Sequence, residues 1–508
     1  MVVVQPADWQ ESDSNYKYVV DVFGRNQDFD VVKVRLTGFY PYFYLLAKDG
    51  ESADQLYSAI ELSSGKKMIG MKITQELKLD AMKGFTGLKT IKVWKIACPA
   101  LWMFKTVIKT LKNGFCLKGR HIFHSDIYEA NLPPFIRLFH ELDISPASPF
   151  EFEADEEDPE DGIIVDKCYT VHYKEITPKP TTNIPLYILG FDIEVYSDSG
   201  LFPVSKNDLD EITQIGMSFR WSDNLLKSER RCVIVNGEVS KSEDPDVEYI
   251  SCKNEKQLLL TFEKLIQEEN PDAICGYNTF GFDDAYIADR AAKNMARLQL
   301  GRTEGSSAWK YESAYVPTER KKFELASGTF DVRFFEMPGR LPIDLLLSVR
   351  REQNLDSYKL DNVASTFLRD KVTKVERIDT QHVKIHTKNT RGLFNGNLVR
   401  FDIVGNTINP YQEGRKFPVQ DVEAKSFVVV TQDTILNDVD ISKLEWSFTK
   451  DDVSFKDMLE SHHGTPDQRA NIAKYCLQDC DLVLTLMAKL DTLVNARGMA
   501  DVLSLIHI

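Results

Sequence analysis

The 508-residue sequence has no uninterrupted apolar run of about eighteen residues, the length that a helix needs to cross a bilayer. Its first residues, Met1 to Pro6, lack a basic flank and a long apolar stretch, so we expect no secretory signal and no membrane partner. The eight cysteines include no Cys-x-x-Cys pair, which argues against a zinc ribbon or a thioredoxin-like site. We therefore expect a protein with reduced thiols that is not secreted.

An excess of basic residues is also missing. The 62 Lys and Arg residues are outnumbered by 77 Asp and Glu residues, for a net charge of −15. Glu151 to Asp161 alone supplies eight acids in eleven residues. Arg320-Lys321-Lys322 is a local basic run, although such runs are most often solvated surface. We infer a modest affinity for nucleic acid that depends on metal and salt.

The length favours two to four domains, and 43% hydrophobic with 27% charged residues is typical of a folded protein. From Tyr16 to Leu46 the pattern alternates like paired strands. A strand is expected at Thr90–Ile96 and a helix at Pro99–Leu111. The aromatic run Phe39–Tyr44 either stacks on bases or, more commonly, forms core strands. These elements predict an α+β N-terminal domain over residues 1–150.

The remainder of the chain reads as a second domain. The acidic run predicts a linker over 151–180. A strand at Tyr187–Phe191 and an amphipathic helix at Glu255–Glu268 favour an α/β domain over 181–498. Lys371 to Val430 is rich in Val, Ile and Thr, and it predicts a β-rich insertion at about 371–445. Asp467 to Ala496 is a long helical stretch.

Asp192 and Glu194 lie two residues apart on an expected strand. The period of two places both carboxylates on one face, roughly 7 Å apart along the chain, with Phe191, Ile193 and Val195 toward the core. Two adjacent acids destabilise a strand unless a cation bridges them. Taken alone, Asp-x-Glu is a common pattern.

A second acidic position follows a tight loop. Asn278 suits the loop, and Phe282-Asp283 suits the first turn of a helix. Helix capping alone would also explain Asp283, and Asp284 is the neighbouring rival for a ligand. Asn278 either contacts the metal site or the nucleic acid, or it holds the loop.

The third acid is expected on a helix. Tyr475 and Asp479 are four residues apart and share a helical face, whereas Asp481 points elsewhere. A tyrosine beside a metal-bound water can orient that water. A surface Tyr–Asp pair is the simpler alternative.

Together the three motifs supply four carboxylates and no basic residue. Such a cluster cannot stay ionised in one place unless cations hold it. Oxygen-only ligation indicates Mg²⁺ or Mn²⁺ and not Zn²⁺. Two such ions about 4 Å apart form a clamp for in-line attack on a phosphodiester. The sequence therefore predicts a two-metal nuclease.

The ordered triple resembles the Exo I, Exo II and Exo III motifs of the DEDD exonucleases, which have a ribonuclease-H-like fold. The tyrosine four residues before the last acid is typical of the DEDDy branch. Further segments are similar to family B DNA polymerases, most closely to the delta type and to those of large DNA viruses. These segments are Tyr128–Pro133, Phe202-Pro203, Thr213–Gly216, Gly339–Leu345 and Ser357–Leu360.

The resemblance implies that the four acids hold two Mg²⁺ or Mn²⁺ ions, that Tyr475 aligns the attacking water, and that Asn278 and Phe282 lie near the frayed primer 3′ end. It also implies a β-hairpin that separates primer from template, with Lys321–Phe323 and Phe330–Phe334 as candidate strands. The implied partners are a DNA primer-template with a single-stranded 3′ end, and a sliding clamp or polymerase accessory subunits.

One departure from the family concerns the palm. The motifs Asp-x-x-Ser-Leu-Tyr-Pro and Tyr-Gly-Asp-Thr-Asp do not occur, and Ala500 to Ile508 is an apolar run unlike a solvated natural end. We expect a truncated product in which 499–508 begins the polymerase region, and which cannot extend a primer.

Three functions compete at this stage. The favoured one is the proofreading 3′→5′ exodeoxyribonuclease portion of a replicative DNA polymerase, acting in the nucleus or at a viral replication site. The chain could instead be a non-catalytic nucleic-acid-binding fragment of that polymerase. A free-standing DEDDy exonuclease is the third, but the polymerase-like segments count against it.

Overall fold

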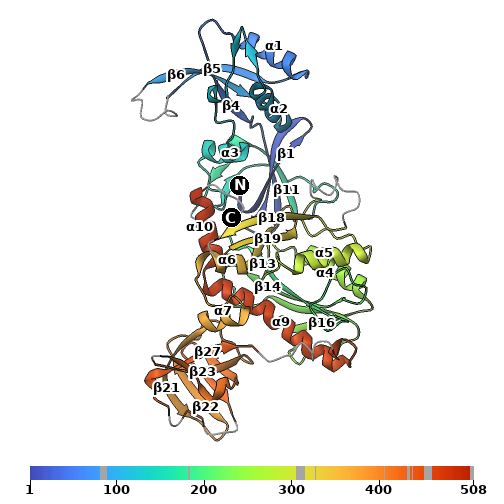
Figure 1. Ribbon diagram of the computed structural model, residues 1–508, viewed down its shortest axis with the longest axis vertical. Helices are drawn as coiled ribbons and strands as arrows, with labels where there is room; N and C mark the ends of the chain where they lie inside the picture. Colours follow the sequence, from blue (N-terminus) through green and yellow to red (C-terminus); the bar gives the residue numbers. More distant parts are fainter. Residues whose placement is uncertain are drawn as a thin grey trace. The chain divides into compact units, whose positions relative to one another are not determined.

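The computed structural model describes residues 1–79, 89–180, 184–304, 315–325, 328–405, 407–431, 435–436, 439–450 and 460–503. The chain divides into two compact units, Met1–Ile184 with Arg497–Ile508, and Pro185–Ala496 (Figure 1). Among the described helices, none is both long enough and apolar enough to cross a bilayer. All eight cysteines lie in described segments and are free thiols.

The N-terminal unit contains a six-stranded sheet in the order β11-β3-β2-β1-β10-β12. β2 and β3 pair antiparallel, with Val22 opposite Val34, which confirms the hairpin predicted from the alternating valines. The strands are β1 (Val2–Ser14), β2 (Lys17–Asn26), β3 (Val31–Thr37), β10 (Phe150–Phe152), β11 (Lys167–His172) and β12 (Thr177–Pro178).

The stretch expected as an acidic linker, 151–180, is instead part of this sheet. β11 pairs parallel with β3, and β12 pairs with β10. Glu160 lies 3.2 Å from Arg35 and 3.6 Å from Lys33, both on β3. The acidic run therefore has cationic partners on the sheet, which a pattern of like charges cannot reveal.

A second sheet of the same unit has the order β5-β6-β4-β9, and α1 and α2 pack against it. The strand and helix predicted at Thr90–Ile96 and Pro99–Leu111 are confirmed as β6 and α2. The elements are β4 (Tyr42–Leu46), α1 (Ala53–Ser64), β5 (Lys72–Leu79), β6 (Thr90–Ala97), α2 (Leu101–Lys112), β7 (Cys116–Leu117), β8 (Arg120–His121), β9 (Ile127–Tyr128), α3 (Pro134–Leu142) and the 3₁₀ turns His124–Asp126 and Tyr173–Glu175.

The aromatic run at Phe39–Tyr44 is mostly core. Phe39 and Phe43 are buried in two separate hydrophobic clusters. Tyr42 is half-buried, and its ring lies 4.0 Å from Lys95 Nζ and 4.1 Å from the Arg137 guanidinium. The two phenylalanines therefore confirm the prediction that this run forms core strands, and cationic side chains cover the Tyr42 ring.

The second unit is built on a mixed sheet in the order β16-β15-β14-β13-β17-β20. β13 is central; it pairs antiparallel with β14 and parallel with β17, which in turn pairs parallel with β20. The strands are β13 (Tyr187–Val195), β14 (Ile212–Trp221), β15 (Arg230–Asn236), β16 (Val247–Cys252), β17 (Ala273–Gly276) and β20 (Leu341–Asp344).

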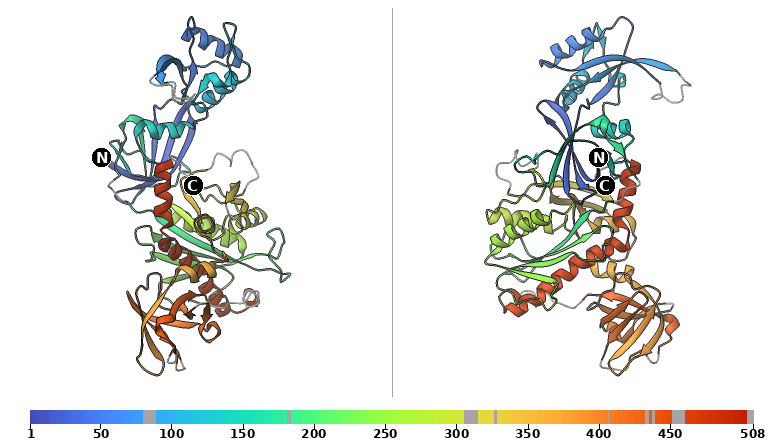
Figure 2. Two further views of the ribbon diagram at one scale, coloured as in Figure 1. Left: turned by 60° about the vertical axis from the view of Figure 1, so that its left-hand side comes forward. Right: turned by 180° about the vertical axis from the view of Figure 1, so that it is seen from behind.

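Helices cover both faces of this sheet, and the longest, α9, runs across β13, β14 and β15 (Figure 2). Leu258, Leu259, Phe262 and Ile266 form the buried stripe of α4, which confirms the helix predicted at Glu255–Glu268. The helices are α4 (Glu255–Glu269), α5 (Asp283–Lys293), α6 (Leu345–Glu352), α7 (Leu360–Phe367), α9 (Pro466–Lys489) and α10 (Thr492–Leu503), whose last residues belong to the N-terminal unit.

Two β structures extend from this frame. β18 (Thr318–Leu325) and β19 (Gly328–Phe335) form the predicted antiparallel hairpin, with the exposed Arg320-Lys321-Lys322 run on β18. The β-rich region forms its own sheet, which closes on itself because β23 pairs with both β25 and β27. Its elements are β21 (Arg369–Arg377), β22 (His382–Thr387), β23 (Leu398–Val404), β24 (Ile408–Pro410), β25 (Phe417–Glu423), β26 (Ser426–Val430), β27 (Leu444–Thr449) and the 3₁₀ turns Tyr411–Gly414 and Ile441–Lys443.

Candidate active site

The central strand β13 carries the first two acids. Asp192 lies opposite Gly216 and Glu194 lies opposite Gln214 on β14. Phe191 and Ile193, which alternate with the acids, are buried in the core. The strand periodicity predicted from the sequence therefore holds, and both carboxylates remain partly accessible.

Helix α9 brings the third motif onto this strand. A Cβ atom at Gly216 would lie 2.9 Å from Cys476 Sγ and 2.8 Å from Cys480 Sγ. Because real Cβ atoms do not approach other atoms so closely, a glycine at this position lets the helix dock on the sheet. Tyr475 and Asp479 then lie on one helical face, as the four-residue spacing predicted.

The second motif lies at the entry to α5. Asn278 adopts a left-handed backbone conformation with φ 66°, and its N–H donates to Asp344 Oδ1 at 2.9 Å. Phe280 N donates to Asp344 Oδ2 at 3.1 Å. Asp283 begins α5 and is 4% exposed. Asp344, which sequence reasoning missed, thus holds the loop that leads to Asp283.

Burial raises the pKa of each of the four acids. It raises the pKa of Glu194 to about 8, that of Asp283 to about 7 and that of Asp479 to about 6. The pKa of Asp192 is well above its ordinary range because of burial and of the charges on Asp283, Asp479 and Glu194. Without a cation, the four acids therefore cannot all be ionised at neutral pH, and a bound divalent cation would favour their ionised forms.

The sequence motifs contained no basic partner for these acids, but the structure supplies one. Lys450 Nζ lies 2.7 Å from Asp479 Oδ2 and 3.2 Å from Tyr475 Oη. Burial alone would lower the pKa of Lys450, but Asp479 and Tyr475 raise it above its ordinary range. Lys450 follows β27 and is 25 residues from Tyr475, so no local spacing rule points to it.

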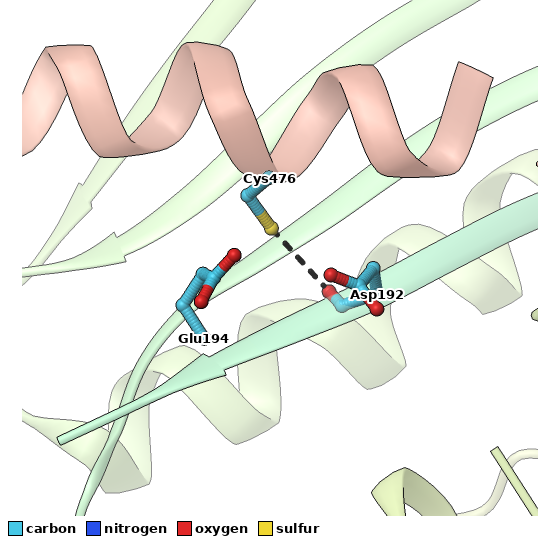
Figure 3. A group of neighbouring side chains, drawn as sticks. All are labelled: Asp192, Glu194 and Cys476. Atoms are coloured by element: carbon cyan, nitrogen blue, oxygen red, sulfur yellow. Dashed lines mark hydrogen bonds between the residues drawn. The ribbon is translucent and has the colours of Figure 1, made fainter. Parts of the chain in front are cut away.

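The donor set fits hard divalent cations. Asp479 Oδ1 is buried without a hydrogen-bond partner in the described part of the chain. Ligand atoms of Asp192, Glu194 and Cys476 lie within 4.8 Å of one another, and the Cys476 thiol contacts the Asp192 carbonyl oxygen at 3.6 Å (Figure 3). The Cys480 contact and burial raise the pKa of Cys476, so this neighbour is a neutral thiol and a poor ligand. The carboxylate oxygens are the better ligands.

The two rival acids have other partners. Asp481 accepts a hydrogen bond from Ser218 Oγ at 2.7 Å and pairs with Arg220, which confirms that it points away from the site. Asp284 is 2% exposed, and its Oδ2 accepts a bond from Phe335 N at 3.1 Å. Asp283 rather than Asp284 receives a hydrogen bond from the backbone of Ile193, which lies between Asp192 and Glu194 on β13.

The residues expected near a primer end lie at the rim of the same loop. Asn278 is exposed, and Phe282 is half-buried against the core. The Phe282 ring lies 5.4 Å from that of Phe202, a 75% exposed side chain on the segment after β13. Burial and the Asp479 charge raise the pKa of Tyr475 to about 12, so its hydroxyl stays protonated.

Residues 125–363 match the family model described as DNA polymerase family B, exonuclease domain. This match indicates a family B exonuclease domain over that part of the chain. The matched region contains Asp192, Glu194 and Asp283 and ends before Tyr475 and Asp479. The prediction of this family from the sequence is therefore confirmed.

Relatives occur among viral and cellular polymerases. The DNA polymerase of Phaeocystis pouchetii virus is 32% identical over 59% of this chain and 30% of its own length. The DNA polymerase of Acanthamoeba polyphaga mimivirus is 26% identical over 98% of this chain and 36% of its own length. The DNA polymerase delta catalytic subunit of Dictyostelium discoideum is 21% identical over 95% of this chain and 38% of its own length. The chain thus spans well under half the length of these curated relatives.

A solved structure has the same fold. The family B DNA polymerase from the hyperthermophilic archaeon Pyrobaculum calidifontis superposes with a TM-score of 0.59 at 17% identity, covering 98% of this chain and 47% of that one. At this identity the likeness concerns the fold alone. It extends over both units of the chain.

Proposed function

We propose that the chain is the 3′→5′ exodeoxyribonuclease, or proofreading, portion of a replicative DNA polymerase. The main support is the convergence of Asp192, Glu194, Asp283 and Asp479 from three distant segments inside and beside a family B exonuclease domain. The strand order around β13, which pairs antiparallel with β14 on one side and parallel with β17 on the other, fits a ribonuclease-H-like DEDDy fold.

The four acids would hold two Mg²⁺ or Mn²⁺ ions. When bound, such ions supply an activated water and stabilise the leaving oxygen of a phosphodiester. The protein's part is to orient these groups. Tyr475 Oη, kept protonated, would donate a hydrogen bond to the attacking water. Lys450 pairs with Asp479 Oδ2, so Oδ1 would remain available to a cation.

The proposed contacts to DNA lie on the loop before α5 and on the β18–β19 hairpin. Asn278 and Phe282 would contact the frayed 3′ end, and β18–β19 would be the hairpin that separates primer from template, with its exposed basic run near phosphates. We assign the N-terminal unit, which extends past the expected boundary at 150 to Ile184, to the N-terminal polymerase domain. We assign the closed β sheet, from β21 to β27, to an insertion in the exonuclease domain. The expected setting is a nuclear or viral replication site, with a sliding clamp or accessory subunits as partners.

The test is digestion of a 5′-labelled primer with a 3′ mismatch by the purified 508-residue chain. Stepwise shortening from the 3′ end in Mg²⁺, abolished by EDTA, is expected. Asp192→Ala and Asp479→Ala should abolish the shortening, whereas Glu243→Ala, which truncates an exposed loop carboxylate in the same way, should not. Near-normal cleavage by either alanine variant would remove the site assignment.

Other outcomes separate the competing functions. DNA binding without release of mononucleotides would make the chain a non-catalytic binding fragment. Preference for single-stranded RNA over DNA would favour a free-standing exonuclease. Incorporation of labelled nucleotide by the chain would contradict the expectation that it cannot extend a primer.

A further inference from the structure

The β18–β19 hairpin is attached to the candidate site through its second strand. Among the described strands, β18 and β19 pair only with each other and join no larger sheet. A two-stranded hairpin is marginally stable by itself, so contacts at its base are needed to hold it. β19 runs beside α5, the helix that begins with Asp283 (Figure 1). Three consecutive residues of β19, Arg333 to Phe335, contact the chain on both sides of Asp283.

Before Asp283, β19 contacts Phe280 in the loop that leads to α5. Arg333 N donates to the Phe280 carbonyl oxygen at 3.0 Å. The rings of Phe280 and Phe334 are stacked, with centroids 4.6 Å apart and planes inclined by 24°. Both rings are buried, and they share a hydrophobic cluster with Val332. The strand therefore holds both the backbone and the side chain of the residue that lies three positions before the acid.

Further along the chain, β19 contacts two carboxylates of α5. Phe335 N donates to Asp284 Oδ2 at 3.1 Å. The Arg333 guanidinium donates to Asp289 Oδ1 at 2.6 Å, and the two side chains of this ion pair are 25% and 28% exposed. Ser205 Oγ donates to the other oxygen of Asp289 at 2.7 Å, which fixes the carboxylate from its second side. The helix is thus held to β19 in its first turn and again five residues later.

The position of Asp283 depends on two anchors of the segment that carries it. Asp344 ties the preceding loop to the central sheet through β20, and Arg333 to Phe335 tie the loop and the helix to the hairpin. A metal ligand must lie within about 0.5 Å of its productive position for a cation to be bound well. Contacts with a purely structural role would stabilise only the hairpin. Because these contacts bracket Asp283, a shift of β19 also moves the acid.

We propose that Arg333 is a positioning residue for Asp283. It acts through the ion pair with Asp289 and through the backbone bond to Phe280, and so it holds the acid where a divalent cation can bind. The β18–β19 hairpin thereby contributes to the metal affinity of a site whose four acids all lie outside it, on β13, α5 and α9. The inference rests on the proposed function, since it takes Asp283 as a metal ligand.

The test measures the affinity of the full chain for Mn²⁺ by electron paramagnetic resonance, in the absence of DNA. Arg333→Met keeps the length of the side chain but removes its charge and its bond to Asp289, and it should weaken Mn²⁺ binding about tenfold. Arg333→Lys, which can still pair with Asp289, should recover most of the lost affinity. Asp289→Asn removes the charge of the partner and should weaken binding in the same direction. Because this change is isosteric and partly exposed, it tests the inference even if Arg333→Met fails to fold.

The matched control is Arg297→Met, which breaks an exposed ion pair with Glu304, 3.5 Å away and outside these contacts. It should leave the Mn²⁺ affinity unchanged, whereas Asp283→Ala gives the affinity expected when the ligand itself is missing. A lower unfolding midpoint with unchanged Mn²⁺ affinity, in Asp289→Asn and a folded Arg333→Met, would make the contacts purely structural and overturn the positioning role. Mn²⁺ binding that weakens as expected, without primer shortening by the wild type, would instead overturn only the nuclease.

Discussion

Glu194→Gln should stabilise the metal-free chain, because the wild-type carboxyl is held where it is difficult to ionise. Its pKa rises from 4.5 to about 8, mainly through burial, with a further contribution from Asp479. At pH 7 the folded state must keep a proton that the unfolded state releases. Over 2.5 pH units that cost is about 3 kcal/mol, and glutamine, which is isosteric and neutral, avoids it.

The sign of the pH dependence follows from the raised pKa. Below pH 4.5 the carboxyl is protonated in both states and costs nothing; the wild type then loses stability progressively as the pH rises toward 8. Calorimetric unfolding in EDTA should therefore show a higher midpoint for Glu194→Gln at pH 7 and equal midpoints at pH 4. A gain of about 1–3 kcal/mol corresponds to several degrees. Mg²⁺ should stabilise the wild type more than the variant.

A matched control is Glu243→Gln, which makes the same chemical change at an exposed loop position. It should leave the midpoint unchanged at both pH values. Equal or lower stability of Glu194→Gln at pH 7, or a gain that persists at pH 4, would refute the explanation that burial and neighbouring acids destabilise the empty site.

Three further predictions concern the groups around the acids. Tyr475→Phe should slow primer shortening about 10–100-fold while Mg²⁺ binding persists, and an unchanged single-turnover rate would leave the ring a packing role. Lys450→Met removes the cation that lowers the pKa of Asp479, so the acidic limb of the pH–rate profile should move up by about one unit; an unmoved limb would contradict this. Asp344→Ala frees the backbone N–H groups of Asn278 and Phe280, and denaturant unfolding should show a loss of about 1–3 kcal/mol, which an unchanged midpoint would exclude.

The acids could be predicted from the sequence because each depends on a local rule. The period of two along β13 places Asp192 and Glu194 on one face of the strand, and the four-residue spacing on α9 places Tyr475 and Asp479 on one face of the helix. These rules operate within one element and survive any tertiary arrangement. The order of the three motifs along the chain then allowed the family to be recognised.

The supporting residues could not be predicted because they act across long separations. Asp344 holds a loop 66 residues earlier, and only the pairing of β17 with β20 brings it there. Cys476 is adjacent to Tyr475 in the sequence, but its contact with Asp192 cannot be predicted from that position. The contact depends on how closely α9 packs against the sheet at Gly216. The acidic stretch does not form the predicted linker for a related reason, because Glu160 pairs with Lys33 and Arg35 on β3, far away in the sequence.

Lys450 shows why counting the charges within the three motifs is not enough to predict the charge balance of the site. A lysine among acids that are proposed to bind metal would be expected to compete with the cations. Of the two Asp479 oxygens, however, Lys450 contacts Oδ2, and Oδ1 has no partner among the residues described. One carboxylate can therefore satisfy both groups, each through a different oxygen. Because Lys450 also lies 3.2 Å from Tyr475 Oη, the same ammonium orients the side chain assigned to the attacking water. The lysine thus reduces the repulsion among the four acids and leaves Asp479 Oδ1 available to a cation.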